Sequence, residues 1–291
     1  MTSLAPFFAS FPVALLVTAL LLGLIVGSFI NVVIHRLPVM LDRTWRRQCD
    51  ELGGKSPPAE ETYNLIVPRS QCPACGRRIT ALENIPLLSF AILRGKCRGC
   101  GKRISWRYPG VELVTGLLSG VIALHFGFTV AAAAALLFTW SLIALTVIDY
   151  DHQLLPDNIT LPLMWLGLLF NLGAVYVPIT SAVIGAMAGY LSLWTVYQLF
   201  KLVTGREGMG FGDFKLFAAL GAWLGWQQLP LIILLSSFVG AVVGLGGILL
   251  LGRDRGVPIP FGPFLCVAGW IALLWGDAIT RSYLQFVRVS F

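Results

Sequence analysis

Residues 129–150 read TVAAAAALLFTWSLIALTVIDY, a run of 22 residues in which the first charged side chain is Asp149. A helix of this length extends about 33 Å, enough to cross the hydrocarbon core of a bilayer, which is about 30 Å thick. An isolated strand could not satisfy its backbone hydrogen bonds in lipid. The run is therefore predicted to be a transmembrane helix.

The rest of the chain has the same character. Hydrophobic residues make up 57% of the 291 positions and charged residues 12%, and the mean hydropathy is +0.80. Soluble domains are nearer half apolar and a quarter charged, so a water-soluble globule is excluded, as are a disordered chain, a collagen and a disulfide-rich secreted peptide. We predict an all-α polytopic membrane protein with about eight transmembrane helices. The other seven apolar runs are 11–34, 109–127, 158–177, 179–203, 213–228 (the shortest), 229–252 and 260–280.

Charge is concentrated in one segment. Residues 35–108 hold 14 of the 21 Lys and Arg residues and 6 of the 14 Asp and Glu residues, so this segment is +8 and the remainder is −1. The sequence thus predicts three parts: a first transmembrane helix within 1–34, a basic water-exposed insertion at 35–108, and a transmembrane domain at 109–291.

The basic residues also predict the topology, because they accumulate on the cytoplasmic side of a membrane. If 35–108 is cytoplasmic, the N-terminus is external and alternate loops return to the cytoplasm. This arrangement puts 19 of the 21 basic residues at the cytoplasmic face, with Arg281 and Arg288 as the exceptions. The returning loops are 149–157, 201–213 and 253–259.

The insertion contains two pairs of cysteines, CPACG at 72–76 and CRGCG at 97–101. Two residues between paired thiolates let both point to one tetrahedral ion, and the following glycine permits the tight turn. We predict a zinc site made by Cys72, Cys75, Cys97 and Cys100, with a structural role in a zinc-ribbon-like module. Two disulfides are the alternative, which a reducing cytoplasm disfavours. Cys49 and Cys266 lack paired spacing and are expected to be free thiols.

The segment between the pairs, 83–93, is too short to cross a bilayer and is either the core of the zinc module or an interfacial element. The basic residues around it have two interpretations. Zinc ribbons often bind nucleic acid. Cationic residues beside a membrane span also meet anionic lipid, each contributing about 1 kcal/mol. We favour anionic membrane lipids as partners and expect no nucleic acid.

Two acidic residues lie at the ends of apolar runs. Asp149 follows TVI at 146–148, and Asp213 ends the string GFGD at 210–213. Crossing parity brings both to the cytoplasmic face at similar depth, and carboxyls are costly enough in a membrane that idle ones are rare. Two carboxyls that share a site do not both ionise, so one would activate water while the other donates a proton to a peptide carbonyl.

The alternative for this pair is helix capping. Asp213 has the position of a cap, Asp149 and Asp151 have that of solvated groups, and Asp157 precedes a run as a cap does. Against this, glycines that would let an extended substrate backbone approach closely surround Asp213. These glycines are Gly205, Gly208, Gly210 and Gly212.

Taken together and in this order, the motifs resemble the bacterial type IV prepilin peptidases, which are GxGD-type aspartyl proteases and N-methyltransferases of pilus and type II secretion systems. The resemblance covers nearly the whole chain. It is carried by 27–38 (GSFINVVIHRLP), the two cysteine pairs, 83–86, 106–109 with Glu112, 149–157 and 210–215.

The resemblance implies a multi-pass protein of the bacterial inner membrane, with its active site at the cytoplasmic face. It implies that Asp149 and Asp213 are catalytic in a peptidase domain at 109–291, and that the four paired cysteines bind Zn²⁺. The implied substrates are prepilins and pseudopilins, cleaved after a Gly that ends a short basic leader. Methylation of the new N-terminal residue, usually Phe, would use S-adenosylmethionine.

Methyl transfer rests on the resemblance alone, because no glycine-rich loop follows a predicted strand. The S-adenosylmethionine-binding residues are unassigned, and Glu112 is equally consistent with aiding a sulfonium or amine and with pairing to Arg107. Two other classes of protein make different predictions. A cation transporter predicts acids distributed along a path, and a scaffold that recruits a partner through its zinc module leaves Asp149 and Asp213 unexplained.

Overall fold

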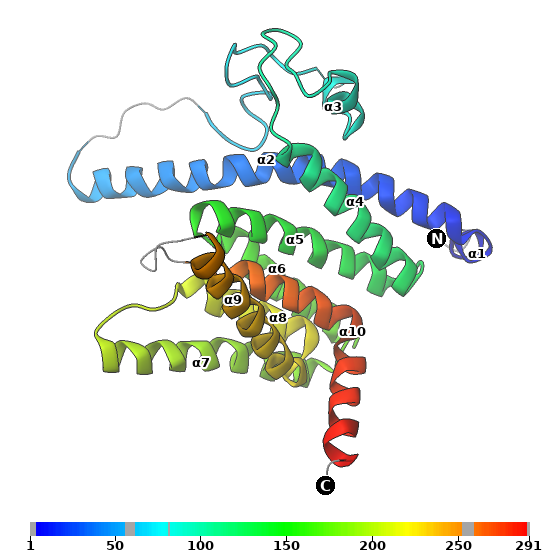
Figure 1. The fold of residues 1–291 in the computed structure, drawn as a ribbon, viewed down its shortest axis with the longest axis vertical. Coiled ribbons are helices and arrows are strands. Elements are labelled where there is room, and N and C mark those ends of the chain that lie inside the picture. The colour runs from blue at the N-terminus through cyan, green and yellow to red at the C-terminus, as the bar shows by residue number, and fades with distance from the viewer. Residues whose placement is uncertain (1–3, 56–61, 81, 252–258, 290–291) are drawn as a thin grey trace. The chain divides into compact units, whose positions relative to one another are not determined.

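The computed structural model describes residues 4–55, 62–80, 82–251 and 259–289 (Figure 1). The described part of the chain is helical and forms no β-strand, which confirms the predicted all-α class. The chain divides into two compact units, residues 1–132 and 133–291. The three-part division of the sequence stays a prediction, and Arg253 and Arg255 of the predicted loop at 253–259 lie outside the described residues.

Eight helices coincide with the eight predicted apolar runs. Six of them are long and apolar enough to cross a membrane. One of these six spans, Trp226–Leu249, includes the short helix η2 (Trp226–Gln228). At 1.5 Å per residue, α6 and α8 are only about 24 and 21 Å long, shorter than the hydrocarbon core. The eight are α2 (Pro12–Leu52), α4 (Arg107–Phe126), α5 (Val130–His152), α6 (Asp157–Leu172), α7 (Ile179–Thr204), α8 (Phe211–Leu224), α9 (Leu229–Leu251) and α10 (Gly262–Val289).

Helix α2 is longer than the apolar run that predicted it. It continues for 18 residues beyond position 34 and remains helical where the sequence becomes polar. Ion pairs at i,i+4 spacing, Arg46 with Asp42 and Arg47 with Glu51, lie along this exposed end and support it. The helix is therefore longer than the apolar run, because residues that form a helix continue after the apolar residues end.

Unit 1 is built on the crossing of α2 and α4, with α1 (Leu4–Ser10) next to the start of α2 (Figure 1). Small residues form the contact. A Cβ atom on Gly23 would lie 2.5 Å from the Ser119 Oγ and 2.8 Å from the Gly116 Cα. Such close approach lets two helix backbones pack by van der Waals contact, which is the usual basis of helix association in lipid.

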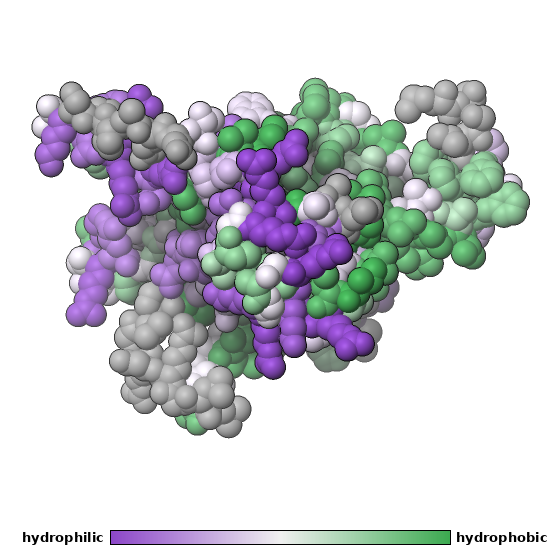
Figure 2. Space-filling view, turned by 90° about the horizontal axis from the view of Figure 1, so that it is seen from above, coloured by the Kyte–Doolittle hydropathy of each residue, from purple (hydrophilic) through white to green (hydrophobic). Residues whose placement is uncertain are grey.

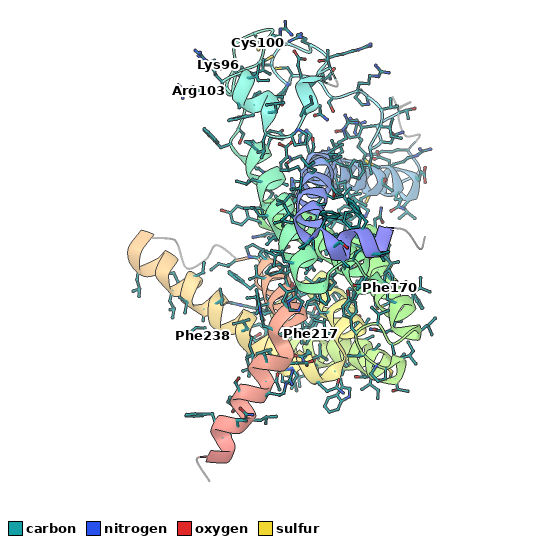
Figure 3. All side chains as sticks on the ribbon, turned by 90° about the vertical axis from the view of Figure 1, so that its right-hand side faces the viewer. Lys96, Cys100, Arg103, Phe170, Phe217 and Phe238 are labelled. Carbon is teal, nitrogen blue, oxygen red and sulfur yellow. The ribbon has the colours of Figure 1, made fainter. Side chains whose placement is uncertain are left out.

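Unit 2 surrounds α8, which is the most buried helix of this unit. Residues 213, 214 and 216–224 of α8 are all buried, against α7, α6 and α10. Figure 3 labels Phe217 of α8, which is 2% exposed inside the bundle, and Phe238 of α9, which is 68% exposed. An all-round apolar helix is expected to be buried in this way.

The crossing of α7 and α8 is set by glycines. A Cβ atom on Gly185 would overlap the Gly221 carbonyl, and one on Gly189 would lie 2.6 Å from the Phe217 carbonyl oxygen. At the far end of α8, the Asn171 side chain of α6 donates to the carbonyls of Ala222 and Trp223 at 2.9 and 3.0 Å. It thereby satisfies carbonyls that the end of a helix leaves unpaired.

This crossing gives the first testable expectation. Gly185→Ala should reduce the stability of the protein by about 1–3 kcal/mol, because the new methyl group meets backbone that cannot move aside. Thermal unfolding of the detergent-solubilised protein measures the change. Gly246→Ala is the matched control, since no described atom lies within 4 Å of that added Cβ. Equal melting temperatures for the two variants would contradict the assignment.

Candidate functional site

The four paired cysteines come together in the insertion. The sulfur atoms of Cys72, Cys75, Cys97 and Cys100 all lie within 4.8 Å of one another, and the Cys72 and Cys100 sulfurs are 3.9 Å apart. All four are free thiols, as are Cys49 and Cys266. The predicted gathering of the two pairs is confirmed, and the set can hold one metal ion.

Both pairs are held by the same turn. The Cys72 amide donates to the Arg77 carbonyl at 2.9 Å, and the Gly76 amide donates to the Cys72 carbonyl at 2.9 Å. The second turn has the same pattern. The Cys97 amide donates to the Lys102 carbonyl at 2.8 Å, and the Gly101 amide donates to the Cys97 carbonyl at 2.9 Å. The glycines after each pair have φ near +70°, a conformation that favours glycine and explains the predicted CxxCG pattern.

Backbone amides around the sulfurs favour thiolates. The N–H groups of Ala74 and Cys75 lower the pKa of the Cys72 thiol to about 6. Those of Cys100 and Gly99 hold the pKa of Cys97 below its ordinary value. The Arg77 amide lowers the pKa of Cys75, but burial and the neighbouring cysteine sulfurs raise it to about 11. The thiolate is the form that binds a metal, so the turns favour that form at Cys72 and Cys97.

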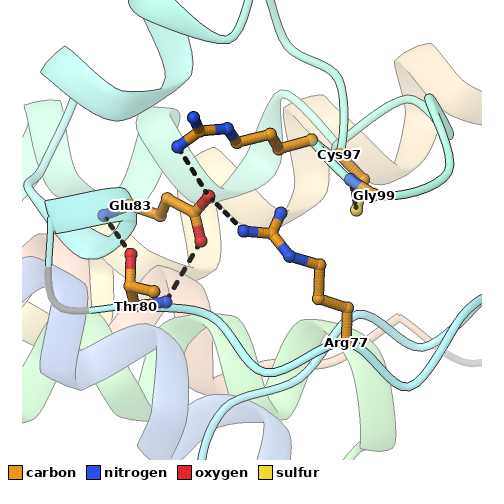
Figure 4. Close-up of polar contacts among 6 residues, drawn as sticks. Arg77, Thr80, Glu83, Cys97 and Gly99 are labelled. Carbon is orange, nitrogen blue, oxygen red and sulfur yellow. Dashed lines mark hydrogen bonds and ion pairs between the residues drawn. The ribbon is translucent and has the colours of Figure 1, made fainter.

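A partly buried carboxylate joins the two turns (Figure 4). Glu83 Oε1 lies 2.8 Å from Arg77 Nη2, in the first turn, and 3.8 Å from Arg98 Nη1, in the second. Its Oε2 accepts the Thr80 amide at 3.1 Å. The Thr80 amide and the Arg77 guanidinium hold the pKa of this carboxyl below its usual range. Glu83 thus stays ionised and connects both halves of the module.

The segment between the pairs forms η1 (Leu82–Asn84) and α3 (Leu88–Ile92). Among the described residues, α3 buries none of its side chains, and Ile92 is 70% exposed. It is therefore not the core of the cysteine module, one of the two positions expected from the sequence. The interfacial position stays a prediction.

Glu112 lies buried where the insertion returns to the helices of unit 1. Its Oε2 accepts the Leu87 amide at 2.9 Å, and the carboxylate also interacts with the Ser28 hydroxyl of α2. One turn along α2, the Asn31 side chain donates to the Tyr108 carbonyl at 3.0 Å. These contacts indicate that Glu112 anchors the end of the insertion to α2 and α4.

The two aspartates come together in unit 2. Asp149 lies near the C-terminal end of α5 and is 5% exposed, and Asp213 is the third residue of α8 and is 8% exposed. The carboxylates are within electrostatic reach of each other, and the buried Cys266 of α10 interacts with both. The three groups come from helices that are far apart in the sequence.

Each carboxylate is held by a glycine amide. The Gly262 amide donates to Asp149, and the Gly210 amide donates to Asp213. The N-cap of α8 is Gly210 and no side-chain cap hydrogen bond is formed there, so Asp213 is not the helix cap that the alternative interpretation expected. The Asp213 Oδ1 is buried without a hydrogen-bond partner among the described residues. An unpaired buried oxygen needs a further explanation, which helix capping does not supply.

The four glycines near Asp213 differ in what they do. Gly205 ends α7 with φ +69°, Gly208 packs against the Phe200 ring, and Gly212 packs against Leu155. Gly205 and Gly210 leave room: no described atom lies within 4 Å of a Cβ added to Gly205, and the nearest one at Gly210 is the Asp213 Oδ2 at 3.7 Å. The expectation that all four admit a substrate backbone is therefore too broad.

Asp157 has a different role from the expected cap. The N-cap of α6 is Pro156, and Asp157 forms no side-chain cap. Its carboxylate pairs instead with Lys215 of α8, with both oxygens 2.7 Å from the Nζ. This pair ties α6 to the helix that carries Asp213, and the sequence offered no signal for it because it joins separate helices.

Two family models cover most of the chain. The bacterial Peptidase A24 N-terminal domain matches residues 21–126, and the type IV leader peptidase family matches residues 136–245. The chain belongs to the type IV leader peptidase family. The first match contains the four clustered cysteines, and the second contains Asp149 and Asp213.

Relatives of this leader peptidase agree over nearly the full length. Proteins from Stutzerimonas stutzeri and Pseudomonas aeruginosa are each 58% identical over 97% of this chain and 98% of their own. A Legionella pneumophila protein is 48% identical over 91% of this chain and 93% of its own. All three are named prepilin leader peptidase/N-methyltransferase. No solved structure matches the chain.

The cysteine cluster of this leader peptidase generates a second prediction. Cys72→Ser should remove bound metal and make residues 70–103 sensitive to protease, because a module this small depends on its ion for folding. Metal analysis and limited proteolysis of the purified protein measure both effects. Cys49→Ser should change neither, since Cys49 is exposed and outside the cluster. Full metal content in the Cys72 variant would refute the prediction.

Proposed function

We propose that this protein is a prepilin leader peptidase and N-methyltransferase. It cleaves the short basic leader of type IV prepilins and pseudopilins after Gly, and it then methylates the new N-terminal residue, usually Phe. Relatives that carry this name and share 58% identity over almost the whole chain support the proposal. The observation that carries it is the pair of buried carboxylates, Asp149 and Asp213, in one place in unit 2.

The proposed cleavage uses the two carboxyls in different protonation states. One, ionised, takes a proton from water as the water oxygen attacks the carbonyl carbon of the peptide bond. The other, neutral, donates its proton to the carbonyl oxygen. As the C–N bond breaks, the departing amine takes the proton that the first carboxylate removed from water, and a hydroxyl of the intermediate returns a proton to the second carboxylate. The Asp213 Oδ1 has no hydrogen-bond partner among the described residues, so its hydrogen-bonding capacity is available for this step.

The exposed residues just before Asp213 suit a peptide substrate. Gly210 has an extended backbone, with φ −79° and ψ 147°, and both it and Gly208 are exposed. An extended leader segment could lie along such a backbone, because no side chain at Gly210 holds it away from the Asp213 carboxylate.

We propose zinc for the cysteine cluster. A tetrahedral ion with Zn–S bonds of about 2.3 Å needs sulfurs on the order of 3.8 Å apart. The 3.9 Å between the Cys72 and Cys100 sulfurs fits this requirement. Four thiolates from Cys72, Cys75, Cys97 and Cys100 leave no open position, so the ion would hold the ribbon together and take no part in cleavage.

The proposed location is the bacterial inner membrane, with the insertion and the aspartates at the cytoplasmic face. Six candidate membrane spans and the concentration of basic residues in 35–108 support it. Figure 2 shows hydrophilic side chains gathered over the insertion and an apolar surface along the first half of α2. We propose anionic lipid headgroups as the partners of these basic residues, rather than nucleic acid.

Methyl transfer would take its methyl group from S-adenosylmethionine, a co-substrate that the activity requires. An aspartyl pair has no role in this transfer, so cleavage and methylation should be separable. Asp149→Asn should still methylate a synthetic substrate that already begins with the mature Phe. Intact-mass analysis with S-adenosylmethionine present measures the product. Complete loss of methylation by a folded variant would show that both activities share one centre.

The decisive test concerns the carboxylates. Asp149→Asn or Asp213→Asn should each reduce cleavage of a prepilin by about 10²–10⁴-fold, because Asn is nearly isosteric but can neither accept nor exchange the proton. The double variant should be no worse than either single one, since groups that act as a unit are non-additive. Mass analysis of the cleaved substrate, with membrane insertion verified, is the measurement.

Asp151→Asn is the control for these variants, because Asp151 is exposed and lies only two residues from Asp149. It should retain substantial activity. Near-normal processing by a well-expressed Asp213→Asn enzyme would end the aspartyl-protease proposal.

A further inference from the structure

The start of α10 lies against the Asp149 carboxylate. Gly262 is the first residue of this helix, and its amide donates to Asp149. The first intrahelical bonds of α10 are made by Phe264 and Leu265, both to the Phe261 carbonyl at 3.1 and 3.2 Å. The Gly262 amide is thus one of the N–H groups that a helix start leaves unpaired, and it is directed at an acidic side chain.

The contact leaves no room for a side chain. A Cβ atom on Gly262 would lie 2.5 Å from the Asp149 Oδ2, 3.1 Å from its Cγ and 3.2 Å from the Leu155 Cδ1. At Gly210, which serves Asp213 in the same way, the nearest atom would be 3.7 Å away, an ordinary van der Waals distance. Of the two aspartates, Asp149 is therefore the one packed tightly against the glycine whose amide it accepts.

The next turn of α10 faces the same carboxylates. Cys266 is four residues after Gly262, on the same face of the helix. It is 2% exposed and interacts with both Asp149 and Asp213, and with the Thr146 side chain. The first two turns of α10 consequently form one wall of the aspartate site, although the sequence marked this segment only as a membrane run.

We propose that Gly262 is a positioning residue for leader cleavage: its amide and its lack of a side chain fix the Asp149 carboxylate against the start of α10. This inference rests on the proposed peptidase function of the aspartate pair. The start of α10 holds the Asp149 carboxylate within electrostatic reach of the Asp213 carboxyl. Gly262 touches no substrate and acts only through Asp149.

The test compares prepilin cleavage by the full-length enzyme and by Gly262→Ala. We expect kcat to fall about 100-fold, the effect of moving a catalytic group by about 1 Å, while KM for the prepilin stays close to that of the wild type. A loss of substrate binding would move KM instead. Methylation of a substrate that already begins with Phe should persist. The control is Gly246→Ala, where no described atom lies within 4 Å of the added Cβ, and it should cleave at the wild-type rate.

A second variant separates positioning from folding, because the methyl group of Gly262→Ala also meets Leu155. Leu155→Ala removes that contact and leaves the one with Asp149. The double variant Leu155→Ala/Gly262→Ala should fold as Leu155→Ala does and still show the loss of kcat relative to it. Recovery of kcat to the level of Leu155→Ala would overturn the inference, as would wild-type kcat for Gly262→Ala.

The proposed function fails by a different result. If Asp149→Asn cleaves prepilin normally, the aspartate mechanism is wrong and Gly262 has nothing to position. If Asp149→Asn is inactive and Gly262→Ala is fully active, the mechanism stands and only the role of Gly262 is lost.

Discussion

The burial of α8 is the constraint on which the peptidase half of this protein depends. This short helix carries Asp213 in its first turn and is enclosed by longer helices along almost its whole length. Its close crossing with α7 requires Gly185 and Gly221, where two backbones meet without side chains between them. Any side chain there would displace α8, and Asp213 would move with it. The packing of apolar residues thus determines where a carboxylate is held away from water.

The insertion is stabilised in a different way. It has few buried side chains of its own, so four sulfurs, two identical turns and the Glu83 carboxylate replace a hydrophobic core. Glu112 then attaches its far end to α2 and α4 through the Leu87 amide. Motifs that are separate along the chain therefore come together in unit 1: the cysteines form a cluster, Glu83 connects its two turns, and Glu112 attaches the insertion to the helices.

The two aspartates are each held near the start of a helix. Asp213 uses one oxygen at the start of its own helix and leaves Oδ1 unpaired, whereas Asp149 accepts an amide from the start of another helix. Each carboxylate thereby gains a backbone amide as a partner. The Asp213 Oδ1 stays available for the proposed proton exchange with water and substrate.

The sequence by itself determined the all-α membrane class, the gathering of the four cysteines and the family, because apolar run length, CxxCG spacing and short motifs are local properties. It did not reveal the full length of α2, since helix formation continues after apolarity ends. It also suggested that Gly208 and Gly212 admit a substrate backbone, whereas these glycines pack against Phe200 and Leu155. The Lys215–Asp157 pair and the contact of Gly262 with Asp149 were decided only by the tertiary structure, because each joins helices whose approach depends on how their side chains pack.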